Sequence, residues 1–211
     1  MKQAAAFICR WNRLFRAALP ALFCAEIFGI AACSLSGPPP AEYVLGALPA
    51  ATATTVGQTG LPVLEVKRVQ LPDYLDSTDI LERRGNQLVP SSTSRWGERL
   101  SVGMTRALSA SLAARLPRMV VTATPPIERP ARQLLVDVAA FESREDRQIV
   151  LVARWTILDG TSRQILLTQE TSLVEPVAGA DDGAIVTAMS HALEELADQL
   201  AAWIKSDCGM C

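Results

Sequence analysis

The chain has 211 residues, of which 49% are hydrophobic, and it carries 20 basic and 22 acidic side chains but only one histidine. This length suits one globular domain with its own core. The near-neutral charge argues against a strongly basic nucleic-acid-binding protein, the composition argues against a disordered chain, and the single histidine excludes a multi-histidine metal site.

Residues 1–32 are predicted to form a lipoprotein signal peptide. Basic residues up to Arg16 precede a mainly apolar stretch, residues 17–32, in the order that a secretory signal requires. The stretch is short and contains Pro20 and Glu26, which makes it a poor transmembrane helix. Without these residues the net charge becomes about −5, from 16 basic and 21 acidic side chains, so nucleic-acid binding is less expected still.

The segment Ile30-Ala31-Ala32-Cys33 resembles the lipobox of bacterial lipoproteins. This resemblance implies that Cys33 is lipidated and begins the mature protein, with acyl chains such as palmitate that gain roughly 0.8 kcal/mol per buried methylene. Ser34 is, by the same resemblance, typical of lipoproteins exported to the periplasmic face of the outer membrane of Gram-negative bacteria. The alternative is an uncleaved amphipathic or membrane-spanning segment with a chance cysteine.

Residues 33–60 are predicted to be a lipidated tether. Ser, Pro, Ala, Thr and Gly dominate this segment, and residues 38–40 are three prolines that favour polyproline geometry. A short apolar piece, residues 43–45, is expected to pair as a first strand. The folded domain is expected to span residues 61–205, which leaves 206–211 as a C-terminal tail.

The first half of the domain is predicted to contain a strand, a hairpin and a helix. Residues 61–69 alternate in the manner of a strand, and a hairpin is predicted over residues 80–89 with Gly85 at its turn. After the polar segment 91–94, apolar side chains recur every four residues and predict a helix over residues 96–117. They are Trp96, Leu100, Met104, Leu108 and Leu112.

The second half is predicted to contain one short strand, three longer strands and a second helix. The strands are expected at 119–122, 133–141, 149–158 and 162–174. Asp159-Gly160 is a tight-turn signal, which predicts an antiparallel hairpin for the last two strands, and the longer polar connection 142–148 predicts a second hairpin that joins strands 133–141 and 149–158. An amphipathic helix is expected over residues 181–204, with an apolar stripe of Ile185, Met189, Ala192, Leu196, Leu200 and Trp203.

Together these elements predict an α/β fold: a single domain in which a mixed, largely antiparallel sheet packs with two main helices. Two helices are enough to cover much of one face of such a sheet. Apolar strand residues such as Leu134, Val136 and Val138 then form the core, although the same pattern also suits a lipid-binding groove.

The sequence contains no motif that indicates an enzyme. It lacks a nucleophile elbow, a phosphate-binding glycine loop and an HExxH motif, so we expect no catalytic residue, metal or cofactor. His191 is expected on the surface. Cys208 and Cys211 have the CxxC spacing of redox and zinc sites, but they follow the end of a helix, whose dipole does not favour a thiolate. A local disulfide is the simpler interpretation, and a thiol oxidoreductase is the alternative.

Two motifs in the first half of the domain carry a family resemblance. Residues 71–76 read L-P-D-Y-L-D and residues 95–100 read R-W-G-E-R-L, with an isoleucine strand that ends at Arg83 and an asparagine turn at Asn86 between them. In these residues the chain resembles the PqiC/YmbA family of lipoproteins, which are auxiliary components of ABC-type transport systems.

This resemblance implies a non-catalytic accessory lipoprotein. It would work beside a permease, an ATPase and a periplasmic MCE-domain protein, in a system that moves lipids or other hydrophobic compounds across the periplasm, and the tethered domain would dock that system at the outer membrane. Symmetric MCE assemblies also suggest a homo-oligomer. The candidate partner contacts are Leu71, Pro72, Tyr74, Leu75 and Trp96; alternatively, Tyr74 and Trp96 pack the loop onto the first helix.

A second function class shares the same anchor, tether and small α/β domain. It is a structural or regulatory outer-membrane lipoprotein that activates an envelope synthase or an assembly machine. The identity of the proteins that associate with the chain distinguishes the two classes.

Overall fold

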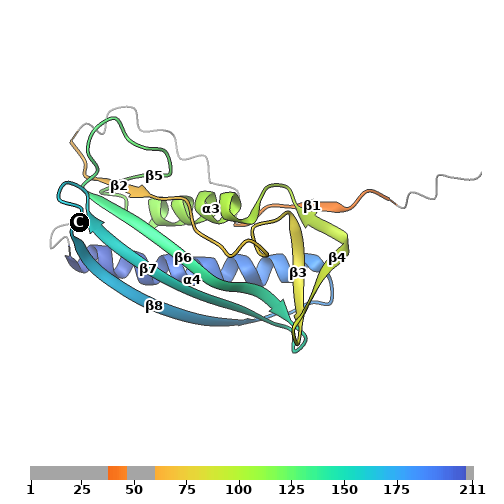
Figure 1. Ribbon diagram of the computed structural model, residues 1–211. Coiled ribbons are helices and arrows are strands. Elements are labelled where there is room, and N and C mark those ends of the chain that lie inside the picture. Colours follow the sequence, from red (N-terminus) through yellow and green to blue (C-terminus); the bar gives the residue numbers. More distant parts are fainter. Residues whose placement is uncertain (1–37, 47–59, 208–211) are drawn as a thin grey trace, which may run out of the picture. The chain divides into compact units, whose positions relative to one another are not determined.

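The computed structural model describes residues 38–46 and 60–207. Its sheet is built around one long strand, β6 (Arg132–Arg144) (Figure 1). β7 (Gln148–Asp159) pairs antiparallel with β6 along its length, and β8 (Ile165–Pro176) pairs antiparallel with β7. The two hairpins predicted for this region are therefore confirmed.

The other edge of β6 is shared by two strands. β2 (Val63–Val66) pairs in parallel with the first residues of β6, and β3 (Asp79–Arg84) pairs in parallel with its last residues. β5 (Val120–Thr122) lies parallel to β2 on its far side. β4 (Gln87–Trp96) forms the predicted hairpin with β3 and also pairs with β1 (Ala41–Tyr43). The long pairings are antiparallel and the short ones parallel, which confirms the mixed sheet.

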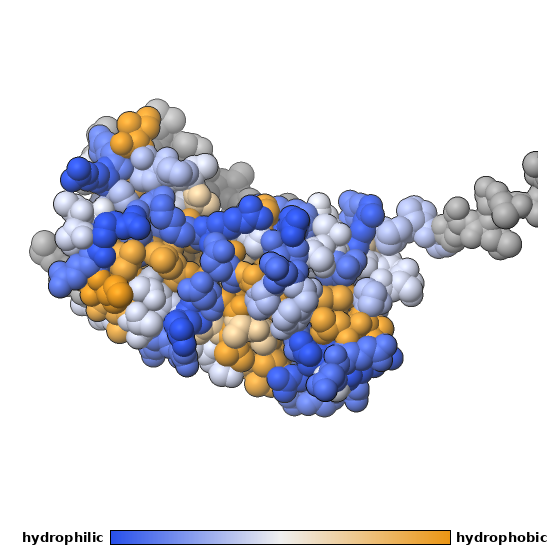
Figure 2. Space-filling view, in the orientation of Figure 1, coloured by the Kyte–Doolittle hydropathy of each residue, from blue (hydrophilic) through white to orange (hydrophobic). Residues whose placement is uncertain are grey.

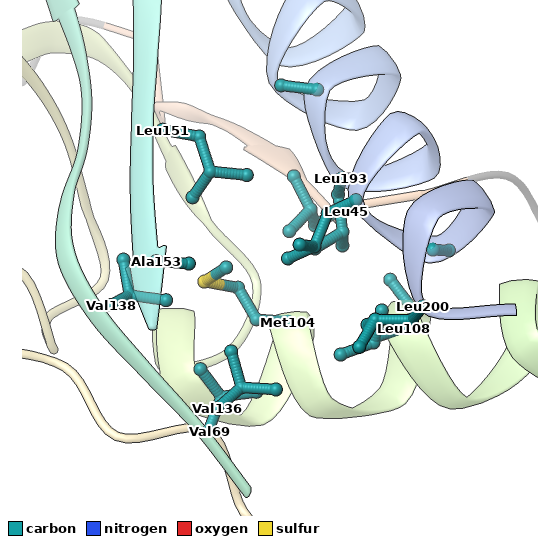
Figure 3. Close-up of a cluster of buried hydrophobic side chains, with 14 of the residues drawn as sticks. Leu45, Val69, Met104, Leu108, Val136, Val138, Leu151, Ala153, Leu193 and Leu200 are labelled. Carbon is teal, nitrogen blue, oxygen red and sulfur yellow. The ribbon is translucent and has the colours of Figure 1, made fainter. Parts of the chain in front are cut away.

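Two helices cover one side of this sheet. Figure 1 shows α3 (Leu100–Arg115) and α4 (Asp182–Asp207) on the same side, with α4 running along β6, β7 and β8. The core lies between these layers: Figure 3 shows Met104 of α3 pointing toward Ala153 of the sheet, and Leu108 close to Leu200 of α4. All four side chains are at most 1% exposed, and burial of a leucine or methionine side chain contributes about 1.5–3 kcal/mol.

The apolar strand residues that also suited a lipid groove belong to this core. Leu134 is 0%, Val136 1% and Val138 4% exposed, because the helices pack against the face of the sheet that carries them. They therefore stabilise the fold.

A buried polar chain fixes α4 against the sheet. The indole Nε1 of Trp155 on β7 donates a hydrogen bond to Thr171 Oγ1 on β8 (3.1 Å). The same hydroxyl donates to Gln199 Oε1 on α4 (2.9 Å). Because Trp155 is only 1% exposed, an unpaired indole N–H would be costly, so these bonds favour one position of the helix on the sheet.

The predicted start of the first helix was wrong. The polar segment 91–94 forms the second half of β4, and Trp96 is the last residue of that strand. α3 begins at Leu100. Trp96 is 3% exposed and belongs to the core, so it fits the apolar pattern although it lies outside the helix. The four-residue spacing to Leu100 is also compatible with a strand that ends just before a helix.

The hydroxyl groups of this polar segment bind Asp182 of α4. Its carboxylate accepts hydrogen bonds from Ser91 Oγ (2.7 Å) and Thr93 Oγ1 (3.0 Å). Burial raises the pKa of Asp182, but hydrogen bonds from Ser94, Ser91 and Thr93 outweigh burial and leave the pKa below its ordinary value. The hydroxyl-rich segment is thus one side of a contact with the first turn of α4.

α4 agrees closely with the predicted helix. It continues three residues beyond the predicted end, and the Asp181 carboxylate accepts a hydrogen bond from the Ala184 N–H (2.9 Å) at its start, as an N-cap does. The buried stripe is wider than predicted because both the sheet and α3 pack on it. It also includes Leu193, Ala197, Ala201 and Ile204, whereas Ile185 and Trp203 are only partly buried.

The β7–β8 turn is wider than the tight turn that Asp159-Gly160 predicts. The Asp159 N–H donates to Gln164 O (2.9 Å), and Arg163, with φ 62°, is the residue in the left-handed region. The Asp159 carboxylate accepts a hydrogen bond from the Ser162 N–H (2.8 Å). This bond stabilises the wider turn and contributes most to lowering the pKa of Asp159.

Gly160 instead allows two backbone segments to approach each other. A Cβ atom at this position would lie 1.7 Å from the Pro130 carbonyl oxygen and 2.6 Å from its carbonyl carbon. The Gly160 N–H also donates a hydrogen bond to Ala131 O (3.1 Å). Only glycine fits here, because no flexible side chain can move aside.

We therefore expect Gly160→Ala to lower the free energy of unfolding by about 1–3 kcal/mol, since backbone atoms must shift to admit a methyl group. Gly103→Ala in α3 is the matched control. Its new Cβ would first meet Glu98 Oε1, at 3.4 Å, and alanine should stabilise the helix interior by about 0.5–1 kcal/mol. Urea unfolding measures both changes, and stabilisation by Gly160→Ala would contradict the close-approach role.

Candidate functional site

The candidate site is the 71–76 loop, which bridges the two strands that share one edge of β6. Residues 67–70 continue from β2 along β6 through backbone hydrogen bonds. The chain then leaves the sheet and turns at Pro72, whose carbonyl oxygen accepts a hydrogen bond from the Leu75 N–H (2.9 Å). It returns as β3 at the far end of the same edge. The pairing of β6 therefore sets the position of the loop.

The five predicted contact residues divide into surface and core. Tyr74 is 41% exposed, and Leu71 and Pro72 are half-buried. Leu75 is 1% and Trp96 3% exposed, so these two side chains hold the loop in the fold and do not reach the surface. The part of the candidate site that a partner can touch is Leu71, Pro72 and Tyr74.

Tyr74 lies over a partly buried ion pair. The Arg83 guanidinium is 5.6 Å from the centre of the tyrosine ring, a distance typical of a cation–π contact. Arg83 binds Glu142 through two hydrogen bonds, one of them from Nη2 to Oε2 at 3.0 Å. The Glu142 side chain is 3% exposed, and its hydrogen bond raises the pKa of Arg83. The tyrosine ring is thus held in a fixed position on the surface.

Asp76 connects the loop to α3. Its carboxylate accepts a hydrogen bond from the Ser101 N–H (3.0 Å) and lies 3.3 Å from Arg99 Nε. The N-cap residue Arg99 makes no side-chain capping bond, so Asp76 supplies the acceptor from outside the helix. Burial raises the pKa of Asp76. The Ser101 hydrogen bonds and the positive charges of Arg99 and Arg68 lower it by more, so the pKa lies below its ordinary value.

Sequence reasoning missed the partners of these loop residues. Arg83 and Glu142 lie 59 positions apart in the chain, and only the parallel pairing of β3 with β6 brings them together. The signals that existed were weak: an arginine at the end of a strand, and an acid next to the buried Phe141. Neither identifies its partner.

Outside the loop, the described residues offer few reactive groups. No group of three or more His, Cys, Asp or Glu side chains suited to a metal ion occurs within residues 38–46 and 60–207, and His191 is exposed. In the same ranges, no helix has the length and apolar character needed to cross a membrane. Cys33, Cys208 and Cys211 lie outside the described residues.

The face of the sheet that the helices leave uncovered is not a continuous apolar surface. Figure 2 shows apolar patches on the viewed side that are interrupted by charged and polar residues. Ile165, Leu166 and Val174 of β8 are exposed. An exposed ion pair between Arg154 of β7 and Glu170 of β8 lies among them. This mixed character is ordinary for a protein surface, so the sheet face does not define a second site.

The structure thus defines a class of protein: an α/β domain with helices on one side of its sheet and a structurally fixed, exposed loop. The chain belongs to the family of the ABC-type transport auxiliary lipoprotein component, whose model matches residues 43–201. This match confirms the resemblance to the PqiC/YmbA family. It makes the chain an auxiliary lipoprotein component that is associated with an ABC-type transport system in the cell envelope.

Two crystal structures share the fold. One is of an uncharacterized protein, with a TM-score of 0.67 and 20% sequence identity, over 79% of this chain and 99% of that chain. The other is of protein XCC0632 from Xanthomonas campestris, of the family DUF330, with a TM-score of 0.59 and 17% identity, over 79% of this chain and 92% of that chain. At these identities the likeness concerns the fold alone. None of the curated proteins matches the chain.

The Asp76 contact predicts a pH-dependent contribution to stability. Asp76→Ala removes the oxygen that accepts the Ser101 N–H and should lower the free energy of unfolding near pH 7 by about 1 kcal/mol, the usual size of a lost helix cap. Because the folded-state pKa lies below 3.8, this contribution is present above pH 3.8 and is lost as the pH falls through the folded pKa. Urea unfolding of both proteins between pH 7 and pH 2.5 measures the difference.

Asp73→Ala is the matched control for this measurement. Asp73 is an exposed carboxylate of the same loop, and no change above about 0.5 kcal/mol is expected there. If the two variants lost equal stability, or if the Asp76 effect grew in acid, the capping role would be wrong.

Proposed function

We propose that this chain is the accessory lipoprotein that holds an ABC-type transport system at the outer membrane. The observation that carries this proposal is the family match over residues 43–201, together with the lipobox Ile30-Ala31-Ala32-Cys33 that precedes it. Lipidated Cys33 anchors the chain in the periplasmic leaflet of the outer membrane, and Ser34 is compatible with export to that membrane.

The partner in this proposal is a periplasmic MCE-domain protein, which works with a permease and an ATPase. The chain has no phosphate-binding glycine loop, so the energy of transport comes from ATP hydrolysis in the partner ATPase. The cargo is a lipid or another hydrophobic compound that must cross the aqueous periplasm. The role of this chain is to dock the assembly, and no catalytic step is assigned to it.

The 71–76 loop is the proposed docking surface. Tyr74 offers an amphipathic aromatic ring that is partly exposed, and aromatic side chains of this kind dominate many protein interfaces. The underlying Arg83–Glu142 pair and the buried Leu75 hold the loop in place before binding, which reduces the entropy lost on association. A loop that is already ordered is therefore well suited to docking.

Tyr74→Ala should weaken copurification of the MCE-domain partner from crosslinked membranes by about tenfold, the effect of losing one aromatic anchor. Tyr74→Phe keeps the ring over Arg83 and should retain most binding. Leu75 is left unchanged, because Leu75→Ala in the core would cost about 2–5 kcal/mol and would confuse unfolding with lost binding.

Val174→Ala is the matched control, since Val174 is 53% exposed on β8, away from the loop. Wild-type copurification by a folded Tyr74→Ala protein would rule out the loop as the docking surface. Recovery of an envelope synthase or assembly machine, without ABC components, would support the regulatory alternative.

The anchor has its own test. Cys33→Ser should abolish incorporation of labelled palmitate, because the Cys33 thiol is the proposed acceptor of the lipid. Ser34→Asp should leave lipidation intact but shift the protein to the inner membrane in a bacterium with enterobacterial sorting. Sucrose-gradient fractionation measures the location of the Ser34→Asp protein, and undiminished palmitate labelling of Cys33→Ser would disprove the proposed anchor.

A further inference from the structure

A cleft at the end of α3 combines an apolar lining with positive charge. It has a volume of about 370 Å³ and is formed by the last turn of α3, the segment that leads to β5, and the last turn of α4. Its lining includes Ala114, Leu116, Pro117, Arg118, Met119 and Lys205. This volume is at the lower end of the range of small-molecule sites.

The floor of the cleft is rigid and apolar. Leu116 is 2% and Met119 5% exposed, and both belong to the hydrophobic core. Ala114 and Pro117 are exposed beside them. The next residue along the chain, Val120, is 36% exposed, so apolar surface continues outward from the cleft. The lining is thus suited to an aliphatic group.

The rim of the cleft carries positive charge that the protein does not neutralise. Arg118 and Lys205 are exposed, and neither forms an ion pair or a side-chain hydrogen bond with another described residue. Arg115, which also lines the cleft, is engaged by Asp198 at 2.6 and 3.0 Å. Hydrogen bonding from Arg115 is the main reason that the pKa of Asp198 is lowered, and the positive charge of Lys205 also lowers this pKa. Arg118 and Lys205 are therefore the two cations of the rim that no ion pair engages.

Two other clefts in the described part of the chain lack this property. The cleft between the hairpin tips, of about 420 Å³, brings Arg83 and Arg144 together with Glu145 and Asp146. The cleft beside β4, of about 230 Å³, contains Arg84 together with the acids Glu82 and Asp182. The charges of the first cleft balance and those of the second leave one acid in excess, whereas the cleft at the end of α3 has cations without an acid in its lining.

We infer that this cleft binds an anionic amphiphile, with a phosphate headgroup between Arg118 and Lys205 and the first part of an acyl chain on Leu116 and Met119. Charge complementarity selects the headgroup, since both cations can donate charge-assisted hydrogen bonds to phosphate oxygens. The limited volume fits a headgroup and the start of a chain, and the remaining acyl chain extends over Val120. The inference rests on the proposed function, because it gives the accessory lipoprotein a direct contact with a phospholipid cargo.

The test uses the chain from Ser34 onward, which contains all the described residues and their hydrophobic core. Dihexanoyl phosphatidylglycerol, below its micelle concentration, is titrated while backbone amide NMR shifts are recorded. Shifts should centre on residues 114–120 and 205. Dihexanoyl phosphatidylcholine and inorganic phosphate, titrated in the same way, should each bind at least tenfold more weakly, because one lacks net charge and the other lacks the apolar part.

Two variants separate the charged and apolar contributions. Arg118→Glu combined with Lys205→Glu should reduce phosphatidylglycerol affinity by at least tenfold, whereas Arg118→Lys combined with Lys205→Arg should retain it. Ala114→Trp leaves every charge in place but fills the apolar lining, and it should reduce affinity similarly. Arg144→Glu combined with Arg147→Glu, at the exposed β6–β7 turn, is the matched control and should bind as the unaltered chain does.

Several results would overturn the inference. Equal binding of inorganic phosphate and phosphatidylglycerol would make the cleft a simple anion site, and equal binding of the two lipids would remove the role of the cations. Unchanged affinity in the folded Arg118→Glu, Lys205→Glu protein would show that these cations only complement the helix C-termini. If lipid binding failed while the full chain still copurified with the ABC components, the lipid site would be wrong and the proposed docking function would stand.

Discussion

The division of one β6 edge between two strands is the constraint on which the rest of the structure depends. β7 occupies the other edge along its length, whereas β2 and β3 each take one end of the shared edge. The chain must therefore leave the sheet between them, and it does so at the 71–76 loop. Main-chain pairing thus places a short exposed segment at a defined position, and the buried Leu75 keeps it there.

Each strand on the shared edge is held by a buried carboxylate. Glu65 of β2 is 3% exposed and is bound by Lys67 (2.5 Å) and by Gln133 of β6 (2.6 Å). Glu142 of β6 is 2% exposed and is bound by Arg83 of β3. Loss of one partner of such a pair leaves a buried charge and costs several kcal/mol. These contacts therefore favour one assignment of strands to the edge, and with it one position of the loop above Arg83.

α3 connects the two surfaces for which we propose a function. Its first turn receives the loop carboxylate Asp76, its middle is buried between the sheet and α4, and its last turn borders the cationic cleft. A helix of 16 residues is about 24 Å long, so the loop and the cleft are separate surfaces on one rigid element. In the proposed function, a partner docked on the loop would leave the cleft free to contact cargo.

The sequence by itself determined the α/β class, both helices, the three hairpins and the family, because hydrophobic periodicity, turn residues and the L-P-D-Y-L-D and R-W motifs are local properties of the chain. It did not determine which elements pair at a distance. It placed Trp96 on a helix and could not separate the exposed Tyr74 from the buried Leu75, one position away. Only the tertiary structure decided these points, because burial of a loop residue and partners such as Arg83 and Glu142 depend on contacts between segments that lie far apart in the chain.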